Sequence, residues 1–125
     1  MIEKLQLVNL VPEVSTDEIE ISSPEINRPA LQLAGYFEHF ASERVQIIGY
    51  VEYTYLKSLD RDVKLANYEQ FLSSDIPCVI YSTRTEPDED MIELAKKHHK
   101  PLLSSHRITS DLMAEVIRWL GVELA

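Results

Sequence analysis

Hydrophobic and polar positions along this 125-residue chain follow strand-like and helix-like periods in turn. Residues 5–7 and 19–21 alternate between apolar and polar, and this period of two predicts two short, half-exposed strands. Residues 45–50 and 78–82 are almost uninterruptedly apolar, which is typical of strands buried on both faces. A further short strand is expected at residues 102–103.

Helical patterns separate these strands. Pro29 favours the start of a short helix that Gly35 would end. Residues 52–59 and 63–72 are expected to form two helices, or one broken helix, with Asp60 or Asp62 capping the second piece.

Two further helices have clear end signals. After Pro87, acidic residues fill a first turn and lysines follow at the far end, in the order that the helix dipole favours. The last helix is expected to begin at Thr109, Ser110 or Asp111 and to stop at Gly121.

The alternation of strands and helices from residue 45 to residue 120 predicts right-handed crossovers and mostly parallel pairing. The two early strands would make the sheet mixed. The predicted class is therefore α/β: a single domain over residues 1–125 with a mixed, mostly parallel sheet flanked by helices. Its core is expected to include Val45, Ile47, Ile48, Val79, Ile80, Leu102, Val116 and Ile117.

The net charge and the composition argue against nucleic acid and membranes as binding partners. The formal net charge is −9, a sign that repels nucleic acid and anionic lipid, so neither is expected as a partner. No apolar run approaches the roughly 20 residues of a membrane span. The single cysteine, Cys78, excludes an intrachain disulfide, and with no export signal the expected location is the cytoplasm.

The sequence lacks the motifs that nucleotide binding, metal binding and cysteine catalysis require. With glycine only at positions 35, 49 and 121, neither a phosphate-binding loop nor a dinucleotide fingerprint is present. The four histidines and Cys78 lack metal-ligand spacing, so no metal site is expected. Cys78 lies in an apolar strand and is expected to be a buried thiol rather than a nucleophile.

Polar residues follow two of the predicted core strands. The carboxyl ends of parallel strands meet at one edge of a sheet, where ligands bind. Seven residues would gather at that edge as a site for a small anion: Ser82, Thr83, Arg84, Ser104, Ser105, His106 and Arg107. The favoured alternative is ordinary polar loop chemistry, and a small hydrolase built on Ser104, Ser105 or His106 is a remote third.

Four residues suggest a binding surface. Arg28, Tyr36, Phe37 and Arg44 combine arginines with aromatic rings, which often anchor interfaces. The favoured alternative is structural, with the two arginines paired to Glu25, Glu38 or Glu43 inside the fold.

The same region carries a family resemblance. The run NRPALQLAGYF at residues 27–37, with Phe40, ERVQ at residues 43–46 and Gly49, resembles the N-terminal domain of bacterial HPr kinase/phosphorylase. The run SDIPCVI at residues 74–80, with TR at 83–84 and EP at 86–87, is similar to that family in the same order. Ala30 departs from the family's usual glycine, and Thr85 from its usual Gly-Leu.

This resemblance implies a fold and a role. The family's domain is similar in fold to the N-terminal domain of Mur ligases. The full-length enzyme would use ATP and Mg, or pyrophosphate, to phosphorylate a serine of HPr and to remove that phosphate, in control of carbon-source use. Its kinase domain would follow this segment, which needs no cofactor of its own. A non-catalytic role in regulation or assembly is thus expected, with homo-oligomers among the possible states. The alternative is a stand-alone small-molecule sensor or adaptor that reuses the fold.

Overall fold

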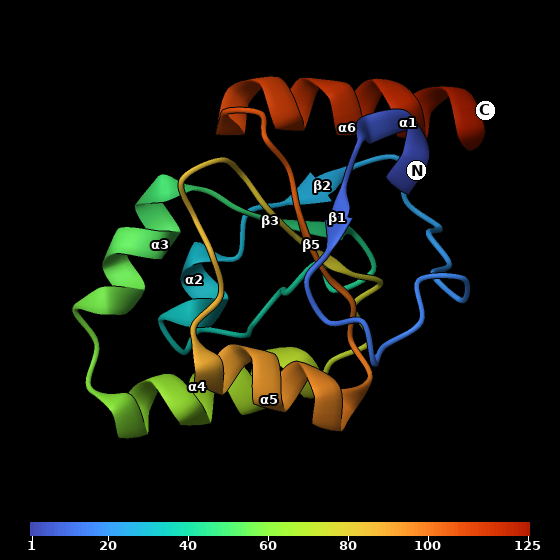
Figure 1. The fold of residues 1–125 in the computed structure, drawn as a ribbon. Helices are drawn as coiled ribbons and strands as arrows, with labels where there is room; N and C mark the ends of the chain where they lie inside the picture. Colours follow the sequence, from blue (N-terminus) through green and yellow to red (C-terminus); the bar gives the residue numbers. More distant parts are fainter.

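A computed structural model describes all of residues 1–125 (Figure 1). In chain order its elements are α1 (Ile2–Leu5), β1 (Val8–Asn9), β2 (Ile26–Asn27), α2 (Ala30–Leu33), β3 (Val45–Ile48), α3 (Tyr50–Lys57), α4 (Arg61–Ser73), β4 (Val79–Tyr81), α5 (Glu89–His98), β5 (Leu102–Ser104) and α6 (Thr109–Glu123).

The five strands form one sheet in the order β1-β5-β4-β3-β2. The pairs β2–β3, β3–β4 and β4–β5 are parallel, and β1 runs antiparallel to β5 at one edge. The predicted class, a mixed and mostly parallel α/β sheet flanked by helices, is confirmed. The sheet is mixed through β1 alone, because β2 is parallel to β3.

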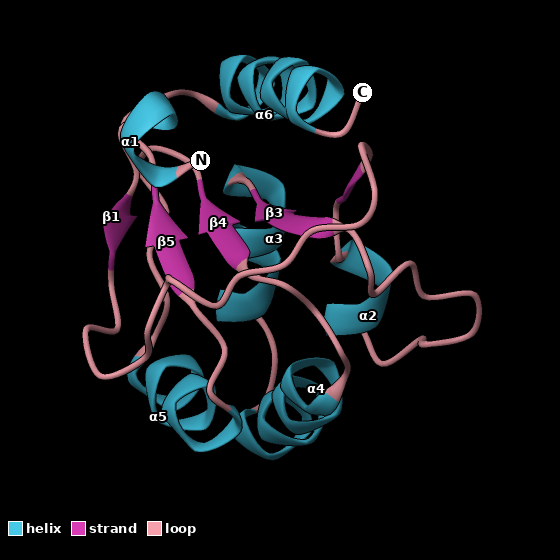
Figure 2. Cartoon of the chain, turned by 90° about the vertical axis from the view of Figure 1, so that its right-hand side faces the viewer, coloured by secondary structure: helices cyan, strands magenta, loops and turns pink.

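Helices cover both faces of the sheet, so the domain has three layers (Figure 2). One apolar cluster joins the sheet to α4 and α5 and includes Ile48, Phe71, Tyr81 and Met91. A second cluster, on the other face, joins it to α1 and α6 and includes Ile80. The alternation of side chains along each strand therefore serves two cores, as expected for strands buried on both faces.

Seven of the eight predicted core residues are buried, and Ile117 is the exception. Its side chain is 46% exposed, whereas Leu112, Val116 and Leu120 on the same helix are fully buried. These three residues are spaced by four and form a narrow stripe, from which Ile117 is rotated toward solvent. The prediction that Ile117 belongs to the core is wrong.

The early strands were misplaced by the alternating pattern. Leu5 and Leu7 are both buried, but Leu5 ends the α1 turn and Gln6 follows in a left-handed conformation with φ 56°. A helix cap can thus mimic the period of two. Ile19 and Ile21 are half-buried against the α6-side core in a segment that pairs with no strand. The second strand of the chain is instead β2.

Some of the predicted helix ends agree with the structure, and the end predicted for the last helix does not. Gly35 adopts φ +99° just after α2, and Asp60 occupies the position before α4. Asp88 caps α5 through a hydrogen bond from the Met91 amide. Gly121, by contrast, lies inside α6, which continues to Glu123, so the predicted stop at Gly121 is wrong.

Candidate functional site

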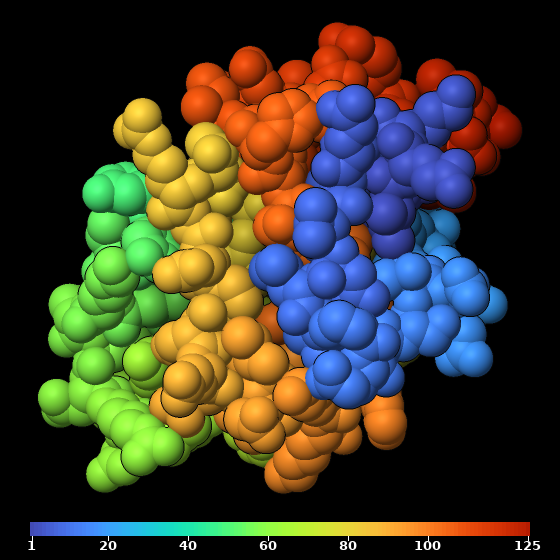
Figure 3. All heavy atoms as spheres, viewed as in Figure 1, coloured from blue at the N-terminus to red at the C-terminus, as the bar shows by residue number.

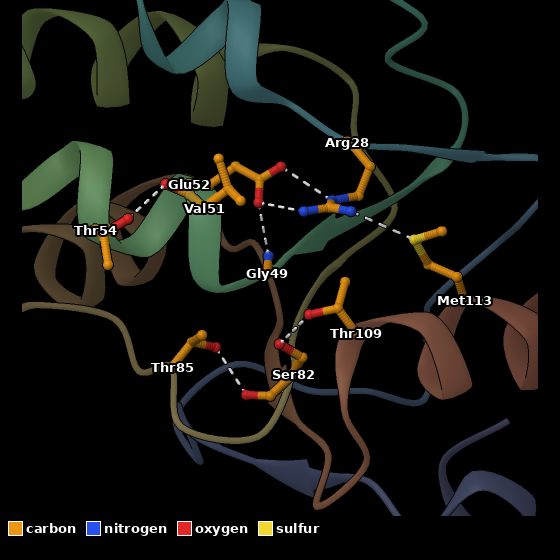
Figure 4. A network of polar contacts seen from close by, with 9 residues as sticks. All are labelled: Arg28, Gly49, Val51, Glu52, Thr54, Ser82, Thr85, Thr109 and Met113. Carbon is orange, nitrogen blue, oxygen red and sulfur yellow. Dashed lines mark hydrogen bonds and ion pairs between the residues drawn. The ribbon is translucent and has the colours of Figure 1, made fainter.

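The carboxyl ends of the four parallel strands meet at one edge of the sheet. Arg28 follows β2, Gly49 follows β3 and Ser82 follows β4. The amino end of α6 also reaches this edge through Thr109 (Figure 4). In an open parallel sheet this is the edge at which ligands usually bind.

Arg28 and Glu52 form the main ion pair of this edge. Arg28 Nε donates to one carboxylate oxygen of Glu52 at 2.9 Å, and Arg28 Nη2 donates to the other at 2.5 Å. Glu52 is only 3% exposed, and it also accepts a hydrogen bond of 2.9 Å from the Gly49 amide. Its carboxylate is therefore compensated by three donors, as a buried charge requires.

Gly49 allows the elements of this edge to approach closely. A Cβ added there would lie 2.6 Å from Arg28 Nη2 and 2.7 Å from Thr109 Oγ1. The Thr109 hydroxyl in turn donates to Ser82 Oγ at 2.8 Å. The sequence analysis missed Glu52 and this contact, because the residues concerned come from elements far apart in the chain.

The structure brings the two predicted anion-binding segments together. The Thr83 amide donates to the Arg107 carbonyl, and the Ser105 amide donates to the Tyr81 carbonyl, both at 2.8 Å. Their polar groups are largely used within the fold: Ser105 Oγ accepts from the Arg107 amide.

The two arginines of that prediction differ in their surroundings. Arg107 donates through Nη1 to the Leu5 carbonyl at 2.6 Å, so its guanidinium holds the end of α1. Arg84 is exposed and adopts φ 63°. Ser104 is half-buried at the end of β5, and His106 is exposed. An anion site at this edge stays a prediction.

No arrangement typical of a hydrolase accompanies the serines. No hydrogen bond joins His106 to Ser104 or Ser105 among the polar contacts of the structure. The structure also brings no three His, Cys, Asp or Glu side chains together in a way that could hold a metal ion. Cys78 is fully buried, and this burial raises the pKa of its thiol to about 12.

Of the four predicted interface residues, the two arginines form ion pairs within the fold, Phe37 is partly buried and Tyr36 is exposed. Arg44 pairs with Glu25 at 2.7 Å and lies 4.0 Å from Glu43, as the structural alternative expected. Phe37 packs against the core and meets Phe40 edge to face. Tyr36, at 47% exposed, is the aromatic ring of this set that faces solvent.

A cavity of about 270 Å³ lies beside the carboxyl end of β4. It lies between α3, α4 and the loop that leads from β4 to α5, and it is partly open to solvent. Its lining residues are Tyr53, Leu56, Lys57, Lys64, Tyr68, Tyr81, Glu86, Pro87 and Asp88. Burial and the nearby Asp88 carboxylate raise the pKa values of Tyr68 and Tyr81, so both phenols are neutral. The sequence analysis missed this cavity, because the apolar pattern around Tyr81 predicts only a residue of a buried strand.

A larger, open groove of about 740 Å³ lies at the opposite edge, between residues 13–22 and the loops that enter β4 and β5. Five carboxylates line it: Glu13, Glu18, Glu20, Glu43 and Asp75. Glu13 forms an ion pair with Lys96 at 3.0 Å. The groove concentrates part of the chain's negative charge.

Comparison with known proteins identifies the family. The family model described as HPr serine kinase N terminus matches residues 1–120. This chain belongs to that family. It is 43% identical over 125 residues to HPr kinase/phosphorylase of Lachnoclostridium phytofermentans, an alignment that covers all of this chain and 40% of that protein. It is 38% identical over 125 residues to HPr kinase/phosphorylase of Caldicellulosiruptor bescii, again covering 40% of that protein.

The chain thus spans about two fifths of the length of these relatives. A second kind of similarity concerns the fold alone. The regulatory region of Clostridium perfringens pyrophosphatase, a structure of CBS and DRTGG domains complexed with diadenosine tetraphosphate, superposes with a TM-score of 0.60 at 16% identity. The superposition covers 93% of this chain and 44% of that one. Similarity to Mur ligases stays a prediction. None of the helices is both long and apolar enough to span a lipid bilayer.

Proposed function

We propose that this domain is a non-catalytic regulatory or assembly module of an HPr kinase/phosphorylase. The observation that carries the proposal is the family match over residues 1–120, with relatives of that name in which this segment occupies about two fifths of the length. The absence of a phosphate-binding loop from these 125 residues supports a role without phosphoryl transfer.

The wider role follows from the family. The whole protein would phosphorylate a serine of HPr with ATP and Mg, or pyrophosphate, and remove the phosphate again, in the cytoplasm and in the service of carbon catabolite control. HPr would therefore bind to the catalytic part. This domain would act through contacts with that part or with further copies of itself.

An assay of three proteins tests this role. The first is the Lachnoclostridium relative in full length, the second is the same protein with its first segment replaced by this chain, and the third is this chain alone. Phosphate transfer to HPr is expected for the first two and absent for the third. Light scattering would show whether the replacement preserves the oligomeric state of the relative.

Two results would contradict the proposal. Phosphorylation of HPr by the chain alone would overturn the non-catalytic role. A relative that keeps its full activity, regulation and oligomeric state after complete removal of this segment would overturn a role in regulation or assembly. That second result would favour the alternative of a small-molecule-sensing or adaptor domain whose action is separate from phosphoryl transfer.

A further inference from the structure

The two arginines in the loops after β4 and β5 differ from the other arginines of the chain. Four arginines pair with carboxylates: Arg28, Arg44, Arg61 and Arg118. Arg84 and Arg107 form no ion pair, although the chain carries 21 acidic residues against 12 lysines and arginines. A guanidinium group binds carboxylate or phosphate through several donors, so these two groups remain available to an anion from outside the chain.

The loops that carry the two arginines lie against each other. The Thr83 amide donates to the Arg107 carbonyl at 2.8 Å, so the residue before Arg84 lies beside Arg107. In Figure 3 the gold surface after β4 and the orange surface before α6 accordingly lie side by side. Arg84 is exposed, and no hydrogen bond holds its side chain. Arg107 uses Nη1 for the Leu5 carbonyl, which leaves Nε and Nη2 for a ligand.

The amino end of α6 reaches the same place. Thr109, its first residue, donates its hydroxyl to Ser82 Oγ at 2.8 Å, next to the loop after β4. The preceding residue is Ile108, and no side chain caps the helix. The Leu112 amide donates to the Ile108 carbonyl, so the amides that precede Leu112 in α6 have no helical partner. Free amides and the helix dipole both favour an anion at this end.

Three acidic residues come close to this edge along the chain, and none of them pairs with its arginines. Glu86 lines the cavity beside α3, Glu3 is next to Lys4 on α1, and Asp111 is exposed in the first turn of α6. The five carboxylates of the open groove lie at the opposite edge of the sheet. The two guanidinium groups and the uncapped helix end are therefore the part of this acidic chain that is best suited to an anion.

We propose that Arg84, Arg107 and the amino end of α6 form a binding site for a small phosphate-bearing anion. A phosphate group offers enough acceptor oxygens for two guanidinium groups and the helix amides, whereas a carboxylate is satisfied by one guanidinium. The serines predicted for an anion site do not belong to this set, because Ser82 and Ser105 are buried and already hydrogen-bonded. The proposal does not depend on the kinase assignment, since it concerns this chain's own residues.

Titration of the isotope-labelled chain at constant ionic strength tests the proposal with three probes: inorganic phosphate, glycerol 3-phosphate and acetate. Both phosphates are expected to produce saturable shifts of the amides of residues 83–84, 106–107 and 109–111 at millimolar concentration. Acetate is expected to bind at least about fivefold more weakly, since it offers fewer acceptor oxygens. Tighter binding of glycerol 3-phosphate than of inorganic phosphate would assign the site to phosphate esters, and the reverse order would assign it to free phosphate.

Two variants test the parts of the site. Arg84→Gln should weaken phosphate binding by about tenfold, the effect of one charge-assisted hydrogen bond. The fold should persist, because Arg84 is exposed and unpaired, and the amide spectrum checks this. Arg118→Gln is the matched control, because it removes the same charge from the surface of α6 and should change the affinity by less than about twofold. Asp111→Asn should strengthen binding by about twofold, since it removes a negative charge from the helix end.

Each part of the proposal can fail separately. Phosphate shifts that are absent, unsaturable or spread over the surface would overturn the site, and acetate that binds as tightly as phosphate would overturn the class of ligand. Equal effects of Arg84→Gln and Arg118→Gln would overturn the role of Arg84. Weaker binding in Asp111→Asn would overturn the role of the helix end. None of these results bears on phosphoryl transfer to HPr, so this proposal and the proposed function fail independently.

Discussion

Arg28 and Glu52 join two elements that are far apart in the sequence. The guanidinium at the end of β2 makes two hydrogen bonds to a carboxylate in the first turn of α3, and that carboxylate also accepts from the Gly49 amide. The pair therefore fixes the start of α3 against the edge of the sheet (Figure 4). Because α3 forms one wall of the cavity, the geometry of the edge and the shape of the cavity are linked.

Arg28→Met should destabilise the fold, because it leaves the buried Glu52 carboxylate without its cation. A fully buried pair loses about 3–5 kcal/mol when one partner is removed, and partial exposure of Arg28 reduces the expected loss in unfolding free energy to about 2 kcal/mol. Urea unfolding measures it. The control is Arg118→Met, since Arg118 pairs with Glu115 on the surface of α6 and should change stability by no more than about 0.5 kcal/mol. Equal effects of the two variants would contradict the structural role of Arg28.

Gly49→Ala should destabilise the fold by about 1–3 kcal/mol, as overpacking of a tight contact does. The added methyl would meet the side chains of Arg28 and Thr109 at 2.6–2.8 Å. Gly121→Ala is a matched control of opposite sign. Gly121 lies inside α6 with open space around it, so alanine should stabilise the helix by about 0.5–1 kcal/mol. Thermal unfolding of both variants checks the two signs together, and a stabilising Gly49→Ala would show that the edge can relax.

The parts of the fold that the sequence predicted have strong local signals. Strands β3, β4 and β5 are short and mostly apolar, and α5 has a cap, an acidic first turn and basic residues at its end. The early strands failed because alternation at residues 5–7 arises from a helix cap, which has the same pattern. The stop at Gly121 failed because nothing opposes the continuation of α6, so glycine alone did not end it.

The site was less predictable than the fold, and Glu52 shows why. It was expected only as part of a helix, and neither its pairing with Arg28 nor its burial follows from local pattern. Tyr81 is similar, since its place in β4 predicted burial but not the cavity that its side chain faces. The local pattern predicts which side chains are inside, whereas contacts between distant elements decide which polar groups find partners.

Ile47→Ala and Ile80→Ala should each lower the unfolding free energy by about 2–5 kcal/mol, since both side chains are fully buried in the sheet. Ile117→Ala is the control, because this side chain is 46% exposed. Its substitution should change stability by about 0.5 kcal/mol or less. Denaturant unfolding with a common slope makes the three values comparable. A large loss in Ile117→Ala would show that α6 packs through that side of the helix after all.

Cys78 should make stability fall at alkaline pH. Burial raises its pKa in the folded chain to about 12, whereas an unfolded thiol titrates near about 8.5. The unfolded state therefore loses its proton first, so the contribution of the neutral thiol is fully present below about pH 8.5 and is lost progressively as pH rises toward the folded value. Unfolding free energies measured across this range should fall more steeply for the natural chain than for Cys78→Ala, which lacks the titrating group. A thiol reagent should accordingly modify the native chain far more slowly than the denatured one. Parallel pH profiles of the two proteins, or rapid modification of the native chain, would show that the thiol is accessible to water.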